Sequence, residues 1–176
     1  ITYERLGQAG GIQWPCPEET HPGTETLFME KFGTDDGLAH FQAAPYSAPL
    51  ELPDEAYPYI LSTGRVDFHF HTGSMTRRTA RLQNEISDAY AEISIEDAKS
   101  QQIENGDEVI LKSRRGEVRT RARVTRDIQK GQVFLPWHFP GCLANRLTGP
   151  SAGPPSKMPE FKFTAIHMEK GQTHGK

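Results

Sequence analysis

Short apolar segments separated by turn-forming residues dominate the chain from about residue 57 onward. Each segment is rich in Val, Ile, Leu, Tyr, Phe or Thr, a composition that is typical of β-strands. The six expected strands cover residues 59–63, 90–93, 108–113, 117–124, 133–136 and 161–168. Short strands joined by glycine-containing turns favour a closed β-barrel, so we expect a mainly β fold.

The clearest local signal is a predicted β-hairpin, whose two strands flank the Arg-Arg-Gly turn at residues 114–116. In its second strand, apolar or small side chains alternate with Arg119, Arg121 and Arg123. This period of two predicts one buried face and one basic face. A row of arginines is compatible with nucleic-acid binding, but charged outer faces are common on half-buried strands. We therefore interpret the arginine face as solvated.

Helices are expected to be few and short. Ser94 is a suitable N-cap, and Glu96 and Asp97 place negative charge in the first turn of a helix that ends near Gln102. A single helical turn is expected at residues 143–147, within a long loop that spans residues 141–159.

Residues 1–56 show neither helical nor strand periodicity and contain six prolines, so they are predicted to form an extended arm. Aromatic side chains recur along the arm, and aromatic residues at this density usually pack onto a surface. They are Trp14, Phe28, Phe32, Phe41 and Tyr46. Disorder is the alternative interpretation. Residues 57–170 are expected to form the barrel domain, and residues 171–176 a flexible tail.

Composition narrows the function classes. The 176 residues suit one compact domain with an attached arm, and the net charge of −3 argues against a general nucleic-acid binder. Cys16 and Cys142 form no Cys-x-x-Cys pair, which favours two free thiols. The apolar runs are too short to span a membrane, so no membrane span is expected. The chain does not begin with Met. We therefore expect a fragment, whose missing N-terminal part would carry any targeting signal.

The segment at residues 63–81 carries most of the candidate chemistry. It contains four arginines against one aspartate, two glycines and several hydroxyl side chains, within an acidic chain. Glycine lets backbone N–H groups approach an anion, hydroxyls donate hydrogen bonds, and arginine pairs with phosphate through two donors. These residues predict a phosphate or pyrophosphate cradle, with a solvated polar loop as the alternative.

His69 and His71 are the only residues in this loop that suggest a metal site. If the loop formed a strand, both side chains would project to the same face. However, the nearest following acid is Glu85, and His138 and His167 have no recognised ligand spacing. We therefore predict no metal ligand in this chain. Because neither a nucleophile–base arrangement nor a Rossmann or P-loop glycine motif is present, we also predict no catalytic residue here.

Several motifs in fixed order carry a family resemblance. The string TGRVDFHFHTGSMTRR at residues 63–78 resembles the signature of the molybdopterin-dinucleotide-binding domain, which ends the large subunit of formate dehydrogenases and related nitrate reductases. Further segments resemble the sequence of the same domain. They are residues 91–125, 136–139 (PWHF), 144–148 (ANRLT) and 159–170 (PEFKFTAIHMEK), with a looser resemblance at 6–17 and 53–58.

The resemblance implies a six-stranded double-psi β-barrel that covers a bis(molybdopterin guanine dinucleotide) cofactor with Mo or W. Motif matching implies that residues from two parts of the chain contact this cofactor. They are Thr63, Gly64, Arg65, His69, His71, Thr72, Thr76, Arg77, Trp137, His138, Asn145 and Lys162. An aromatic face suits a flat pterin, an amide matches its donor–acceptor edge, and a cation suits phosphate.

The same resemblance places the catalytic residues, the metal ligand and the 4Fe-4S cysteines in a missing N-terminal part. The implied activity of the whole enzyme is the oxidation of formate to CO₂, with electrons passed to electron-transfer subunits. The cytoplasm is the expected location. The alternatives are the same domain of a nitrate reductase and, from another class, a non-catalytic β-barrel interaction module.

Because the resemblance places the redox centres in the missing N-terminal part, we predict that this 176-residue chain alone does not oxidise formate. The measurement is dye reduction by the purified chain with formate. Formate-dependent turnover above that of a heat-inactivated sample would contradict the prediction.

Overall fold

The computed structural model describes residues 1–149 and 158–171, which divide between two compact units, Ile1–Tyr46 and Ser47–Lys176. The division lies ten residues before the predicted end of the arm at residue 56. Most of the predicted tail, and residues 150–157 of the predicted long loop, lie outside the described residues. Every helix in the described part of the chain is too short or too polar to cross a membrane.

The first unit contains a helix that the sequence pattern did not predict, α1 (Tyr3–Ala9). Thr2 caps its start by accepting a hydrogen bond from the Arg5 backbone N–H, and Gly10 ends it in a left-handed conformation. The helix has two turns and no buried residue, so it leaves no apolar periodicity in the sequence. The rest of the unit is irregular, and Phe28 stacks on Phe32 with ring centroids 5.1 Å apart.

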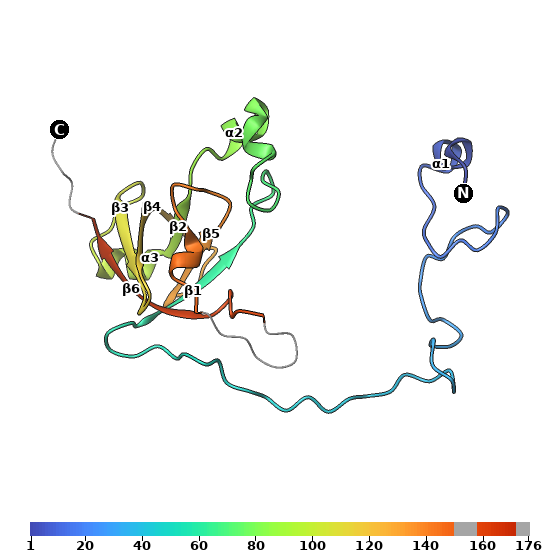
Figure 1. The fold of residues 1–176 in the computed structure, drawn as a ribbon, viewed down its shortest axis with the longest axis horizontal. Coiled ribbons are helices and arrows are strands. Elements are labelled where there is room, and N and C mark those ends of the chain that lie inside the picture. The colour runs from blue at the N-terminus through green and yellow to red at the C-terminus, as the bar shows by residue number, and fades with distance from the viewer. Residues whose placement is uncertain (150–157, 172–176) are drawn as a thin grey trace. The chain divides into compact units, whose positions relative to one another are not determined.

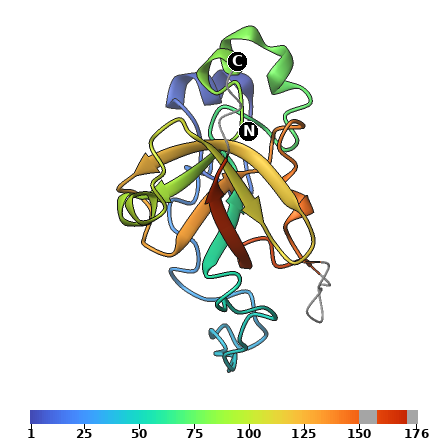
Figure 2. The ribbon, with the colours of Figure 1, turned by 90° about the vertical axis from the view of Figure 1, so that its left-hand side faces the viewer.

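The second unit is a closed β-barrel of six strands (Figures 1 and 2). The strands are β1 (Tyr59–Gly64), β2 (Tyr90–Ser94), β3 (Glu108–Lys112), β4 (Glu117–Thr125), β5 (Gln132–Pro136) and β6 (Thr164–Lys170). Their order around the barrel is β1-β5-β2-β4-β3-β6. Two pairs of non-consecutive strands, β1 with β5 and β2 with β4, run parallel, and the other neighbours are antiparallel. The predicted six-stranded double-psi β-barrel is confirmed.

The barrel interior is filled by aliphatic side chains that alternate along the strands. Leu61, Ile93, Leu111, Leu135 and Ile166 come from five different strands and are 0 % exposed. Full burial of such a side chain contributes roughly 1.5–3 kcal/mol each, so these residues hold the barrel closed.

The predicted alternation in β4 is confirmed, because Val118, Thr120 and Ala122 are buried, Val124 is half-buried and the arginines are exposed. Arg119 lies 3.3 Å from a carboxylate oxygen of Glu108, and Arg123 lies over the ring of Tyr90 at 5.0 Å. Arg123 also lies 3.6 Å from a carboxylate oxygen of Glu92, so Glu108 on β3 and Glu92 on β2 partly neutralise the arginine face.

The last strand begins three residues later than predicted, because residues 161–163 form a turn. The Phe161 backbone N–H donates to the Pro159 carbonyl at 2.9 Å, and the Phe161 carbonyl accepts from both the N–H and the hydroxyl of Thr63. These bonds hold residues 159–163 across the end of β1, where Phe161 and Lys162 line the candidate site described below.

Four short helical elements accompany the barrel in the described residues. The predicted helix is α3 (Ile95–Ser100), with Ser94 as its cap accepting from the Asp97 N–H. The predicted helical turn is η2 (Ala144–Arg146). The turn η1 (Thr76–Arg78) and the helix α2 (Ala80–Glu85), green in Figure 1, were not predicted. The region at residues 64–80 was expected to be loop, and elements of three and six residues are too short for a helical period to show.

Glu51 fastens the segment that precedes β1 to the barrel. Its carboxylate accepts from both terminal nitrogens of Arg115, at 2.6 and 3.1 Å, and from the Ala165 backbone N–H at 2.8 Å. Arg115 belongs to the β3–β4 turn and Ala165 to β6, so one carboxylate joins three segments. The Arg115 guanidinium lowers the pKa of Glu51 below its ordinary value.

We predict that Glu51→Gln lowers the free energy of unfolding by about 1–2 kcal/mol at neutral pH, because charge-assisted hydrogen bonds become neutral ones. Since the pKa of Glu51 is lowered on folding, its stabilisation is present above the ordinary value of 4.5 and is lost as pH falls below it. Urea unfolding at several pH values measures the difference. Glu117→Gln, which alters an exposed carboxylate 3.9 Å from Arg119, is the control. Equal losses in both variants at neutral pH would contradict the prediction.

Candidate functional site

The candidate site forms where two parallel strands end side by side. In the β1–β5 pair Thr63 is opposite Leu135 and Gly64 is opposite Pro136. Because the strands are parallel, the segment after β1 and the segment after β5 leave the barrel at the same edge. The Trp137 backbone N–H donates to the Gly64 carbonyl at 3.2 Å, which extends the pairing into both segments.

A cleft of about 570 Å³ opens at this edge. Its described lining residues come from β1, the segments after β1 and β5, the η2 turn and the turn before β6. They are Thr63, Arg65, Trp137, Asn145, Phe161 and Lys162. Five of these six were predicted as cofactor contacts from the sequence. The structure therefore brings together residues that are up to 99 positions apart in the chain.

The cleft combines positive charge with a flat aromatic wall. The Arg65 guanidinium lies 5.8 Å from the centre of the Trp137 ring, and the Lys162 ammonium donates to the Thr63 carbonyl. Acidic side chains are absent from the described lining residues. Two cations, an amide and an indole suit a ligand that carries phosphate and a planar heterocycle.

Thr63 and Gly64 shape the cleft through packing. The Thr63 side chain is 2 % exposed, and its hydroxyl donates to the Phe161 carbonyl at 2.7 Å. That bond holds the Phe161–Lys162 turn beside β1. A Cβ atom at position 64 would lie 2.4 Å from the Phe134 ring, so only glycine fits there without displacing it.

His69 and His71 do not project to the same face, as they would on a strand. The segment between β1 and η1 is irregular, and His69 is 4 % exposed whereas His71 is exposed. His69 donates from Nε2 to the Ile86 carbonyl at 2.7 Å, and its Nδ1 bonds the Thr76 hydroxyl at 3.0 Å. Within the described residues, no group of three or more His, Cys, Asp or Glu side chains is placed to hold a metal ion.

His138 is buried beside Trp137, which lines the cleft. Both of its ring nitrogens form hydrogen bonds with residues 65–79, which connect β1 to α2 and are called the 65–79 segment below. Nε2 accepts from the Val66 N–H at 2.9 Å, and Nδ1 bonds the His71 carbonyl. Its ring stacks beside Trp137 with centroids 4.8 Å apart. Burial is the main cause that lowers the pKa of His138, so this ring is neutral at physiological pH.

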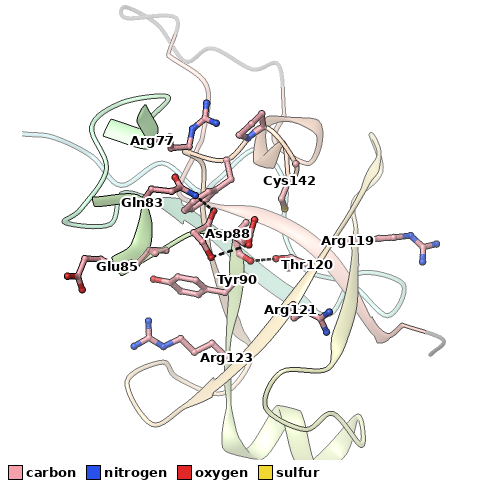
Figure 3. Close-up of a pocket in the computed structure, with 16 residues that line it drawn as sticks. Arg77, Gln83, Glu85, Asp88, Tyr90, Arg119, Thr120, Arg121, Arg123 and Cys142 are labelled. Atoms are coloured by element: carbon pink, nitrogen blue, oxygen red, sulfur yellow. Dashed lines mark hydrogen bonds between the residues drawn. The ribbon is translucent and has the colours of Figure 1, made fainter. Parts of the chain in front are cut away.

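The remaining predicted contacts lie further along the 65–79 segment. Thr72 is exposed, and the Thr76 hydroxyl is engaged with His69 and the Phe70 N–H. Arg77 lies in a different concavity, of about 760 Å³, which also contains Glu85 and Asp88 (Figure 3). Arg77 is therefore separated from the Arg65 cleft in this structure. Its concavity is also lined by Arg119, Arg121 and Arg123 of β4, so the surroundings of Arg77 are basic despite the two acids.

Sequence reasoning missed Phe161 as a lining residue, although it lies beside Lys162 in a segment that was predicted to be strand. The available signal was the Pro159-Glu160 pair before it, because proline and a following polar residue often mark a turn.

Comparison with known proteins decides the family. A model of the family described as Molydopterin dinucleotide binding domain matches residues 59–165, from the first residue of β1 into β6. The chain belongs to this family. The matched region contains the first five strands, the start of β6 and every described residue of the cleft.

Curated relatives extend the match into the first unit. The chain is 48% identical over 170 residues to the F420-dependent formate dehydrogenase subunit alpha of Methanocaldococcus jannaschii, covering 97% of this chain and 25% of the relative. It is 39% identical over 171 residues to the assimilatory nitrate reductase catalytic subunit of Bacillus subtilis, covering 96% and 24%. The chain thus spans about a quarter of the length of these relatives.

A solved structure supports the fold. The chain resembles the acetylene hydratase from Pelobacter acetylenicus with a TM-score of 0.58 and 17% identity, over 65% of this chain and 18% of the other. At this identity the likeness concerns the fold alone.

We predict that Gly64→Ala lowers the free energy of unfolding by about 1–3 kcal/mol, because the added methyl displaces the Phe134 ring. Gly141→Ala is the matched control, since a Cβ there meets nothing within 4 Å. Adding Phe134→Leu should restore part of the loss. Urea unfolding of the three variants provides the test, and equal stability of the Gly64→Ala and Gly141→Ala chains would contradict the packing role.

Proposed function

We propose that the Thr63–Arg65–Trp137–Asn145–Lys162 cleft binds one pyranopterin guanine dinucleotide of a bis(molybdopterin guanine dinucleotide) cofactor that carries Mo or W. The observation that supports this most directly is the cleft itself, in which two cations and an indole face one space within a domain of this family. Segment 65–79 follows Gly64 and forms the adjoining wall with Arg65, His71, Thr72 and Thr76, whereas Arg77 lies in the separate concavity.

Each lining side chain has a distinct task in this proposal. Arg65 and Lys162 pair with phosphate oxygens, and Arg65 does so through two parallel donors. Trp137 lies against the flat heterocycle, and the Asn145 amide offers both a donor and an acceptor to its edge. When bound, the metal cofactor supplies the redox chemistry. The chain's own residues bind and orient it, and they set the local charge.

We further propose that the whole protein is the large subunit of a formate dehydrogenase, which oxidises formate to CO₂. The support is that three relatives named as F420-dependent formate dehydrogenase alpha subunits are 44–48% identical to the chain, against 39% for the assimilatory nitrate reductase. The rest of the large subunit would hold the metal ligand and a 4Fe-4S cluster, and further subunits would accept the electrons. A free-standing interaction module would not require the charged cleft.

We predict that Arg65→Ala in the full-length subunit weakens cofactor binding by about 10- to 100-fold, because a charge-assisted hydrogen bond contributes roughly 1.5–3 kcal/mol. The measurement is pterin and metal content per subunit after identical purification.

The matched control is Arg121→Ala, which deletes the same charge from the outer face of β4, where Arg121 bonds the Gly106 carbonyl at 3.0 Å. This variant should retain the wild-type cofactor content. Equal losses in the two variants, or a loss with Arg121→Ala alone, would show that the cofactor does not bind against Arg65.

A further inference from the structure

The two bonds of His138 define its protonation state. A carbonyl oxygen can only accept, so the Nδ1···His71 contact requires a proton on Nδ1. A backbone N–H can only donate, so the Val66 contact requires a lone pair on Nε2. His138 is consistent with one state alone, the neutral Nδ1–H tautomer.

These bonds hold a strained part of the segment. His71 has a φ of +48°, in the left-handed region that L side chains rarely adopt. Two residues later, a Cβ at Gly73 would lie 3.1 Å from the His138 carbonyl oxygen, so the segment passes directly against the His138 backbone. One histidine therefore contacts the segment at Val66, at His71 and at Gly73. Arg65, the principal cation of the cleft, immediately precedes the first of these points.

We propose that His138 is a positioning residue, a neutral clasp that fixes the 65–79 segment and thereby places Arg65 and His71 for the cofactor without itself binding it. The placement of the cofactor rests on the proposed function, whereas the clasp does not. The proposal differs from the contact role that the family resemblance suggested for His138.

The clasp has a built-in sensitivity to acid. Protonation would put an N–H on Nε2, directly opposite the Val66 N–H, so that two donors face each other. The groups that face the ring are the positive Arg65 and the histidines His69 and His71, each of which opposes a charge on it. The pKa of His138 is lowered when its ring bonds Val66 and His71. This bonded state of the segment is therefore favoured above the ordinary histidine pKa of about 6.5, and it becomes less stable as pH falls below that value.

The first test uses the 176-residue chain with ¹⁵N-labelled histidine. Long-range ¹H–¹⁵N spectra at pH 7.5 report which ring nitrogen carries the proton, and the His138→Gln variant assigns the signal. The expected result is a single species with the proton on Nδ1. A proton on Nε2, or an average over both tautomers, would overturn the clasp.

The second test measures the hydrogen-exchange protection factor of the Val66 amide between pH 8 and pH 5. In the wild-type chain it should fall about fivefold or more below pH 6.5, the effect of losing roughly 1 kcal/mol of hydrogen bonding. In His138→Gln, which lacks a titratable ring, it should not change with pH. His167→Gln, which removes a half-exposed histidine from β6, is the control and should keep the wild-type profile. A wild-type profile in His138→Gln, or a flat one in the wild type, would overturn the proposal.

The third test separates the clasp from the proposed function, using cofactor retention by the loaded full-length subunit at pH 7.5 and pH 5.5. Faster release at pH 5.5 in the wild type than in His138→Gln would support positioning. If Arg65→Ala lowers retention but wild type and His138→Gln release the cofactor alike, the positioning role is overturned. If Arg65→Ala has no effect either, the proposed function is overturned, while the first two tests still decide the clasp.

Discussion

The parallel pairing of β1 with β5 is the constraint on which the site depends. Parallel strands start and end at the same edges, so the chain must leave both strands at one place. Gly64 opposite Pro136 brings residues from separate halves of the sequence together. The buried aliphatic core maintains this register, because a slip of one residue would turn the interior side chains outward.

Segment 65–79 obtains its shape from buried histidines rather than from regular secondary structure. The rings of His69 and His138 are almost fully buried, with centroids 5.9 Å apart. His69 bonds the Thr76 hydroxyl and the Ile86 carbonyl, and His138 bonds the Val66 N–H and the His71 carbonyl. Trp137 and His138 are adjacent in sequence, so the residue that faces the cleft and the residue that holds its wall come from the same strand end. Charge on Arg65 and Lys162 then makes this edge of the barrel attractive to an anion.

Much of this could be predicted from sequence, and the failures have physical reasons. Six strands and the capped helix at Ser94 follow from local pattern and capping chemistry. Helices α1 and α2 are too short to show a period. The opposed orientations of His69 and His71 depend on tertiary hydrogen bonds, and so does the Glu51 bridge. The separation of Arg77 from the cleft likewise follows from where η1 folds. Motif resemblance pointed to five of the six described cleft residues, but only the fold shows which of the predicted contacts share one space.

The most direct measurement is an experimental structure of the loaded full-length subunit. The account predicts phosphate oxygens of one dinucleotide within hydrogen-bonding distance of Arg65 or Lys162, about 2.7–3.2 Å, and its heterocycle against Trp137. A cofactor whose contacts with this domain bypass that cleft, for example on the β4 arginine face, would contradict it.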